Sequence, residues 1–290
     1  MIKKGIILAG GKGTRMSPLT KAVNKQLLPI YDKPLIFYPL SILMLSKIED
    51  ILIIVNKGQL SQYKKILPDG RNLGIKISYK EQDYPRGLPD AFNVGRKFIG
   101  NNNVALILGD NFFYGQNLTK KLIDCTKLKT GAKLILHKVT KPELYVVAKV
   151  NNNNKITLIK EKPKKYLSDL AITGLYFFDK NVVKYVEKLK PSKRNELEIT
   201  DLLNIYRKNG NLKADYIGRG GACIDTGALE DFYKTSAFVS AIENIQGFKI
   251  ACLEEISFLN KWINKKNVLN AIKFYGNCEY SNYLKKLISK

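Results

Sequence analysis

Short apolar segments alternate with longer amphipathic segments along the first part of the chain. The short segments have the length and composition of buried strands, and the longer ones suit helices. The expected strands are residues 6–9, 51–55, 75–79 and 104–108, and the expected helices are residues 34–46, 61–67 and 91–98. This order predicts an α/β fold of Rossmann-like type, with a doubly wound, mostly parallel sheet and helices on both faces.

The last part of the chain has a helical pattern instead. Apolar residues recur at helical spacing in residues 228–242, 262–274 and 280–288. No linker, repeat or low-complexity block divides the sequence. We therefore expect one domain over residues 1–290, with an α/β core in 1–227 and a C-terminal helical region in 228–290.

A glycine-rich loop follows the first expected strand. Residues 10–15 have the sequence Gly-Gly-Lys-Gly-Thr-Arg. Glycine allows the close approach and the positive φ angles that bring backbone N–H groups against phosphate oxygens. A Walker loop would need a Lys-Ser/Thr pair after Gly13, and a dinucleotide fingerprint would need glycine in place of Met16. The loop therefore predicts a phosphate site of another type.

The protein is strongly basic, with a net charge of +24. The positive residues are spread along the chain and accompany asparagine runs at 101–103 and 151–154, as A/T-rich codon usage would produce. No basic stripe with interleaved aromatics and no nucleic-acid-binding motif appears. We expect no nucleic-acid partner, and we expect the positive field to attract nucleotides and sugar phosphates.

The numbers of cysteine and histidine residues and the hydropathy of the chain argue against a zinc protein and a membrane protein. Four widely separated cysteines and one histidine, His137, cannot form a zinc site of usual spacing. His137 falls in an expected strand and is interpreted as structural. No apolar segment is long enough to span a bilayer, and the first strand begins where a signal peptide would lie. A cytoplasmic protein with free thiols and no membrane partner is expected.

Two aspartates are candidates for a metal site. Asp110 follows an expected buried strand and Gly109, and Asp225 lies in Ile224-Asp225-Thr226-Gly227. A single aspartate at a strand end is common, but two carboxylates together suit Mg²⁺ bound to a nucleotide's phosphates. The carboxyl ends of the parallel strands, where ligands gather, also carry the glycine loop.

Several motifs resemble those of one enzyme family. The opening Gly-Gly-x-Gly-Thr-Arg, followed by Thr20 and Lys25, is similar to the signature of sugar-1-phosphate nucleotidylyltransferases. Later motifs appear in the order found in glucose-1-phosphate thymidylyltransferases: residues 106–115, 161–163, 173–176, 196–201 and 225–227. The similarity extends from the first strand to beyond Glu255. It implies a nucleotidyltransferase fold and an enzyme that transfers a thymidylyl group from dTTP to glucose 1-phosphate, giving dTDP-glucose and pyrophosphate.

The resemblance also implies roles for matching residues. Arg15 and Lys25 would neutralise the triphosphate, with Asp110 as the third catalytic residue, and Asp110 and Asp225 would bind Mg²⁺. The nucleotide would contact Leu8, Gly10, Gly11, Gly13, Thr14, Gln82 and Gly87. The sugar phosphate would contact Tyr145, Val146, Glu161, Lys162, Ile172 and Arg194. The family also implies a homotetramer, and often a regulatory nucleotide pocket near residues 114–117.

Some positions keep alternatives open. Glu161-Lys162-Pro163 is also compatible with a solvated turn, and residues 196–201 are interpreted as the start of a helix at Thr200-Asp201. The chain departs from the family pattern around the sugar, at Pro89, Asp90, Val146 and Cys223, and at Gln116 and Asn117 near the regulatory pocket. A different sugar phosphate or nucleotide such as UTP, or a non-catalytic nucleotide-binding protein, therefore remains an alternative.

Overall fold

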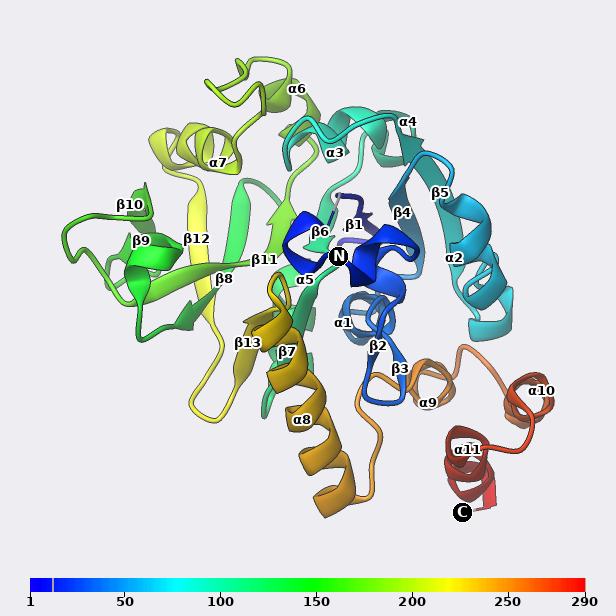
Figure 1. The fold of residues 1–290 in the computed structure, drawn as a ribbon. Helices are drawn as coiled ribbons and strands as arrows, with labels where there is room; N and C mark the ends of the chain where they lie inside the picture. The colour runs from blue at the N-terminus through cyan, green and yellow to red at the C-terminus, as the bar shows by residue number, and fades with distance from the viewer. Residues whose placement is uncertain (12, 290) are drawn as a thin grey trace.

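The computed structural model describes residues 1–11 and 13–289, so Lys12 of the glycine-rich loop lies outside the described residues. Its centre is a parallel block in a nine-stranded sheet (Figure 1). In spatial order the block contains β6 (Val104–Leu108), β1 (Lys4–Ala9), β4 (Asp50–Asn56) and β5 (Lys76–Gln82). All of these strands were predicted; β6, β1 and β4 are mostly buried and apolar, whereas β5, at the edge of the sheet, is only partly buried.

The other half of the sheet is mixed. Antiparallel pairings join β11 to β6, β8 and β9, and β9 to β10, whereas β12 is parallel to β8. These strands are β8 (Ala132–Lys138), β9 (Val146–Val150), β10 (Ile156–Glu161), β11 (Leu170–Phe178) and β12 (Leu212–Tyr216). The asparagine run after β9 forms the turn to β10, with Asn154 at φ 55°, because asparagine tolerates the left-handed conformation. The α/β prediction is confirmed, and the antiparallel pairings are additional to it.

Helices cover both faces of the sheet. One core contains residues of α1 (Phe37–Leu45), α2 (Leu60–Ile66), α5 (Leu118–Thr126) and α9 (Leu253–Leu259). The other contains residues of α3 (Asp90–Val94), α4 (Arg96–Ile99), α6 (Val182–Val186) and α7 (Ile199–Lys208). The single helix expected over 91–98 is interrupted at Gly95, where a Cβ atom would lie 3.0 Å from Ile6. The sequence pattern could not reveal this close approach to the sheet.

Two small ladders lie beside the main sheet. They pair β2 (Pro29–Ile30) with β3 (Lys33–Pro34), and β7 (Asn111–Tyr114) with β13 (Ala222–Asp225). The C-terminal region contains α8 (Leu229–Gln246), α9, α10 (Lys265–Tyr275) and α11 (Glu279–Ser289). Of these helices, only α9 was not expected. No helix among the described residues has the length and apolarity needed to cross a membrane.

Candidate functional site

The glycine-rich loop is held from two sides. The Gly11 N–H donates to Asn56 Oδ1 at 3.0 Å, and Asn56 Nδ2 donates back to the Gly11 carbonyl at 2.9 Å. The Thr20 hydroxyl donates to the Gly13 carbonyl at 2.8 Å. Gly11 and Gly13 have φ angles of 113° and 60°, which favour glycine. The sequence therefore identified the loop and Thr20, whereas the contribution of Asn56 depends on pairing between β1 and β4.

Gly10 leaves space for the buried side chain of Gln82. A Cβ atom on Gly10 would lie 1.7 Å from Gln82 Nε2, so any larger residue would displace that amide. Gln82 ends β5 and lies 3.4 Å from Asn56 Oδ1. Among the other expected nucleotide contacts, Leu8 is in β1 and Thr14 is exposed at the end of the loop. The polar edge beside Gly10 could therefore read a nucleobase.

Lys25 is nearly buried and lies next to the first aspartate. Its side chain is 7% exposed, and Nζ is 2.8 Å from Asp110 Oδ2. The neighbouring Asn24 accepts hydrogen bonds from the Gln26 N–H and the Tyr63 hydroxyl, at 2.9 and 2.8 Å. Lys25 also borders a cavity of about 300 Å³ between the glycine loop and the start of the loop after β5. A buried polar network thus fixes a positive charge beside the cavity.

Asp110 and Asp225 lie on adjacent strand ends. Asp225 pairs with Asn111 in the β13–β7 ladder, and buried Thr226 donates both its N–H and its hydroxyl to the Asp110 carbonyl, at 3.0 and 2.8 Å. Burial, and then the negative charge of Asp110, raises the pKa of Asp225. The positive charges of Lys25 and Arg15 oppose this increase. Water still reaches Asp225 through the open cavity it lines. The expected pair of carboxylates is therefore brought together.

Arg15 approaches the same place from the loop. A Cβ atom on Gly227 would lie 2.6 Å from Arg15 Nη2 and 3.0 Å from Asp225 Oδ1. Glycine at 227 thus leaves room for the guanidinium beside the carboxylate. Arg15, Lys25, Asp110 and Asp225 gather as the sequence predicted.

This donor set suits Mg²⁺ bound together with a nucleotide. No cluster of three or more His, Cys, Asp or Glu able to hold a metal occurs in residues 1–11 and 13–289. Burial, and then repulsion from Asp110, raises the pKa of Asp225, and a divalent cation would stabilise the two carboxylates together. Mg²⁺ commonly takes one or two carboxylates and completes its shell with phosphate oxygens and water. The residues fit such a site, and their remaining partners would come from substrate.

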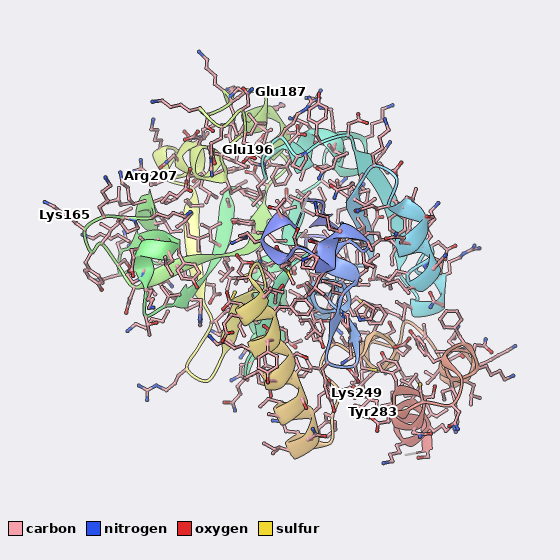
Figure 2. The ribbon with its side chains drawn as sticks, viewed as in Figure 1. Lys165, Glu187, Glu196, Arg207, Lys249 and Tyr283 are labelled. Carbon is pink, nitrogen blue, oxygen red and sulfur yellow. The ribbon has the colours of Figure 1, made fainter. Side chains whose placement is uncertain are left out.

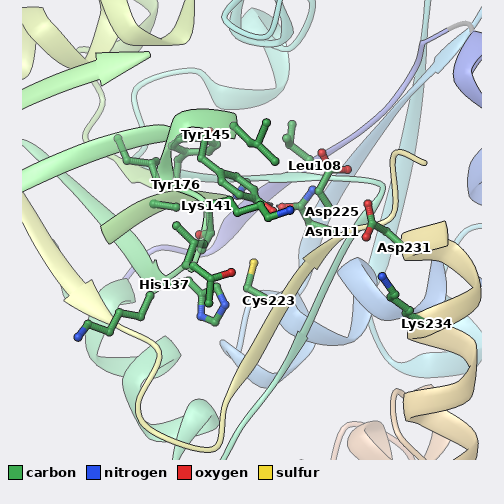
Figure 3. Close-up of a pocket in the computed structure, with 18 residues that line it drawn as sticks. Leu108, Asn111, His137, Lys141, Tyr145, Tyr176, Cys223, Asp225, Asp231 and Lys234 are labelled. Carbon is green, nitrogen blue, oxygen red and sulfur yellow. Dashed lines mark hydrogen bonds between the residues drawn. The ribbon is translucent and has the colours of Figure 1, made fainter. Parts of the chain in front are cut away.

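A second cavity, of about 610 Å³, opens beside the carboxylates (Figure 3). Tyr145 and Ile172 line it, as expected of sugar contacts. At its floor Asn111 Oδ1 accepts a 3.0 Å hydrogen bond from the Gly174 N–H, and a Cβ atom on Gly174 would clash with this amide at 2.6 Å. The cavity lies between the sheet and α8, next to Asp225.

Several lining residues were not expected. They are His137 on β8, Asp231 and Lys234 on α8, and Lys141 after β8, whereas Cys223 on β13 was already expected near the sugar. Burial lowers the pKa of His137, which favours the neutral imidazole, and raises that of the Cys223 thiol. Neither residue has the properties of a nucleophile or a charged acid. The sequence flagged Cys223 only as a departure from a family pattern.

Three other residues expected to contact the sugar phosphate, Val146, Glu161 and Lys162, lie on β9, on β10 and in the turn after β10. Val146 is opposite Glu161, and the Lys162 N–H donates to the Tyr145 carbonyl at 2.8 Å. Val146 packs towards the core below the sheet and is absent from the cavity lining, so its expected effect on the sugar remains a prediction. Arg194 Nη2 is 4.0 Å from Glu161, which links the two expected contacts.

Gly87 has a structural role that the sequence did not indicate. Its φ is 97°, and a Cβ atom would lie 2.1 Å from the Leu197 carbonyl oxygen. The Leu197 N–H also donates to the Arg86 carbonyl at 2.8 Å. The loop after β5 and the loop before α7 are therefore in direct backbone contact. A role for Gly87 in lining the nucleobase remains a prediction.

Comparisons with known proteins agree with this geometry. Residues 4–241 match the nucleotidyl transferase family. A glucose-1-phosphate thymidylyltransferase from Neisseria meningitidis serogroup A is 46% identical over 99% of this chain and 100% of its own length. A Bacillus anthracis crystal structure, provisionally assigned to the same enzyme and bound to sucrose, has a TM-score of 0.75 and 39% identity, covering 81% of this chain and 94% of that one. A UDP-glucose pyrophosphorylase complexed with UDP-glucose has a TM-score of 0.73 and 28% identity, covering 83% of this chain and all of that one.

Proposed function

The chain belongs to the nucleotidyl transferase family, and we propose that it transfers a thymidylyl group from dTTP to α-D-glucose 1-phosphate, forming dTDP-glucose and pyrophosphate. One observation carries this proposal above the others. Arg15, Lys25, Asp110 and Asp225 converge between a loop suited to phosphates and a cavity large enough for a sugar. This is the arrangement that phosphoryl transfer requires, because the reaction depends on positioning and charge neutralisation.

In the proposed reaction, a phosphate oxygen of the sugar phosphate attacks the α-phosphorus of dTTP in line, and the bond to the β-phosphate breaks. Arg15 and Lys25 neutralise the triphosphate and the departing pyrophosphate. Lys162 and Arg194 hold the attacking phosphate, and Glu161 accepts hydrogen bonds from sugar hydroxyls. The Gln82 amide, which occupies the space that Gly10 leaves open, contacts the base. No side chain forms a covalent intermediate.

The proposal includes a divalent cation held by Asp110 and Asp225. When bound, Mg²⁺ would neutralise phosphate charge and orient the α-phosphate. Lys25 Nζ is 2.8 Å from Asp110 Oδ2, so the lysine is held beside the carboxylates, where it would reach the phosphate oxygens of a bound nucleotide. The raised pKa of Asp225 supports this assignment, because cation binding would favour its ionised form.

We also propose that the protein is a cytoplasmic homotetramer. Each subunit would form a single nucleotidyltransferase domain, and its region 228–290 would supply the contacts between subunits. The exposed apolar side chains of Tyr233, Phe248 and Leu259, all within this region, support this because they are available for such contacts. Light scattering coupled to gel filtration measures the assembly. A monomer at micromolar concentration would refute this part alone.

A regulatory nucleotide pocket near residues 114–117 remains part of the proposal. A cavity of about 360 Å³ lined by Tyr114, Gly115 and residues 248–252 supports it. Calorimetric titration with dTDP-sugars, in an Asp110→Asn variant unable to turn over, tests for a second binding event.

The second candidate is the same reaction with another sugar phosphate or with UTP. The polar lining of the 610 Å³ cavity by His137, Lys141 and Lys234 favours it, because these groups offer contacts beyond the sugar residues that were expected. The similarity to a UDP-glucose pyrophosphorylase structure adds that this fold also accommodates a uridine nucleotide.

The deciding experiment measures pyrophosphate release with Mg²⁺, a panel of nucleoside triphosphates and a panel of sugar 1-phosphates. Release with dTTP and glucose 1-phosphate supports the first proposal. Release only with another pair supports the second candidate. No release from folded protein that binds dTTP would indicate a non-catalytic homologue.

A further inference from the structure

Arg194 lies between two carboxylates, Glu161 and Glu198, in the loop before α7. Its Nη2 atom donates to Glu198 Oε1 and Oε2 at 3.0 and 2.9 Å, and Glu161 Oε1 is 4.0 Å away. A guanidinium has five N–H donors, two of them on Nη2. Glu198 therefore occupies one nitrogen and leaves the N–H groups of Nε and Nη1 for another acceptor.

The Glu198 carboxylate is itself fixed. Its side chain is 18% exposed, against 61% for Arg194. A hydrogen bond from the Ser192 hydroxyl lowers the pKa of Glu198, and Arg194 adds to this, while burial opposes it. Glu198 precedes α7 at the N-cap position, yet its side chain makes no capping hydrogen bond. Its contacts are thus with Arg194 and Ser192 and not with the helix.

The backbone around Arg194 is also held. The Arg194 N–H donates to the Ser192 hydroxyl oxygen at 3.2 Å, and the Ser192 N–H donates to the Glu196 carbonyl at 2.8 Å. The Leu197 N–H is bonded to the Arg86 carbonyl of the neighbouring loop. The long arginine side chain is therefore the part of this loop whose position most needs an anchor.

We propose that Glu198 is a positioning residue that holds Arg194 ready to bind the phosphate of the sugar 1-phosphate. This inference rests on the proposed function, in which Arg194 contacts that phosphate. An exposed arginine loses rotamer freedom when it binds, and an anchored one has already lost it. Glu198 also carries a negative charge, but the Arg194 guanidinium, 2.9 Å away, compensates it. The anchoring effect decides the outcome.

The test compares Glu198→Gln with the wild-type enzyme in steady-state kinetics at about 0.15 M salt. The variant is expected to raise KM for glucose 1-phosphate about fivefold, with kcat and KM for dTTP nearly unchanged. Glu196→Gln is the matched control, since Glu196 belongs to the same loop (Figure 2) and its carboxylate forms no ion pair with a described residue. Thermal unfolding verifies that both variants are folded.

A double-mutant cycle separates positioning from a general structural effect. In an Arg194→Ala background, Glu198→Gln should have no further effect on KM, because Glu198 acts through Arg194. A full additional increase in that background would overturn the proposal. So would an unchanged or lowered KM in the single variant.

Failure of the proposed function is distinguishable from failure of this inference. If wild-type protein turns over no sugar phosphate, the proposed function fails, and calorimetry with inorganic phosphate then tests the anchor directly. Weaker phosphate binding by Glu198→Gln than by Glu196→Gln would support it, and equal binding would refute it. If the wild type is active and Glu198→Gln behaves like Glu196→Gln, only this inference fails.

Discussion

The two sides of the site are built differently. On the nucleotide side, Lys25 and Asn24 are buried and the loop is held by hydrogen bonds from Asn56 and Thr20. On the predicted sugar side, Glu161, Lys162 and Arg194 are exposed and lie at the end of β10 or in turns and loops. A buried polar network resists substitution because each lost partner leaves an unsatisfied group, whereas exposed charges can change at little cost to the fold. Specificity for the sugar can therefore vary while triphosphate chemistry is kept.

Asp110→Asn should have the largest effect on this comparison, because it removes a carboxylate shared by both sides. We expect kcat to fall by about 10³-fold or more, since the proposed Mg²⁺ site loses one of two protein ligands. Pyrophosphate release measures it. Asp124→Asn, at an exposed aspartate paired with Lys127, is the control and should retain full activity. Wild-type turnover by Asp110→Asn would disprove the metal assignment.

Gly10→Ala should mainly weaken nucleotide binding. The added Cβ would lie 1.7 Å from Gln82 Nε2, so the amide must move. We expect KM for dTTP to rise by about tenfold or more, equivalent to roughly 1.4 kcal/mol, with a smaller change for glucose 1-phosphate. Gly218→Ala is the control, because no atom lies within 4 Å of its added Cβ and its φ is not positive. Equal effects on both substrates would contradict a base contact by Gln82.

Asn24→Ala and Lys162→Ala should separate stability from binding. Asn24→Ala removes the acceptor of the Gln26 N–H and leaves the buried Tyr63 hydroxyl with only the Ala9 carbonyl at 3.2 Å, so we expect the free energy of unfolding to fall by about 2 kcal/mol. Lys162→Ala should leave stability unchanged and raise KM for glucose 1-phosphate. Urea unfolding and steady-state kinetics measure the two effects. If Lys162→Ala also unfolded readily, the sugar side would be less independent of the core than proposed.

Protonation of Asp225 on acidification should have the smallest effect. Its raised pKa means that the folded protein takes up a proton there at a higher pH than the unfolded chain. Stability contributed by this group is therefore gained as pH falls through the folded pKa, and lost as pH rises. Apparent Mg²⁺ affinity should change in the opposite direction, because only the ionised form binds.

Apparent Mg²⁺ affinity, measured by calorimetry with dTTP across the range above the ordinary aspartate pKa of about 3.9, tests the expected pH dependence. Asp225→Asn should remove that dependence. Affinity that stays constant down to the ordinary aspartate pKa would indicate that Asp225 does not bind the cation.

Most of the fold was predictable because its signals are local. The apolar strands 51–55 and 104–108 lie in β4 and β6, and the C-terminal helices are α8, α10 and α11 as expected. The break at Gly95, α9 and the antiparallel pairings of β11 were not predicted. They depend on packing against distant segments, which hydrophobic periodicity does not encode.

For the site, the sequence by itself determined which residues we predict to meet phosphate and metal: the glycine loop, Arg15, Lys25, Asp110 and Asp225. These residues belong to short local motifs, and a parallel sheet brings the carboxyl ends of its strands to one edge. Only the tertiary structure decided which neighbours hold them. Asn56 on the loop and Thr226 on Asp110 act across separate elements, whereas Glu198 holds Arg194 from four residues away in the same loop. Hydrogen bonds of a few ångströms depend on strand register and loop packing, and these are settled only when the chain is folded.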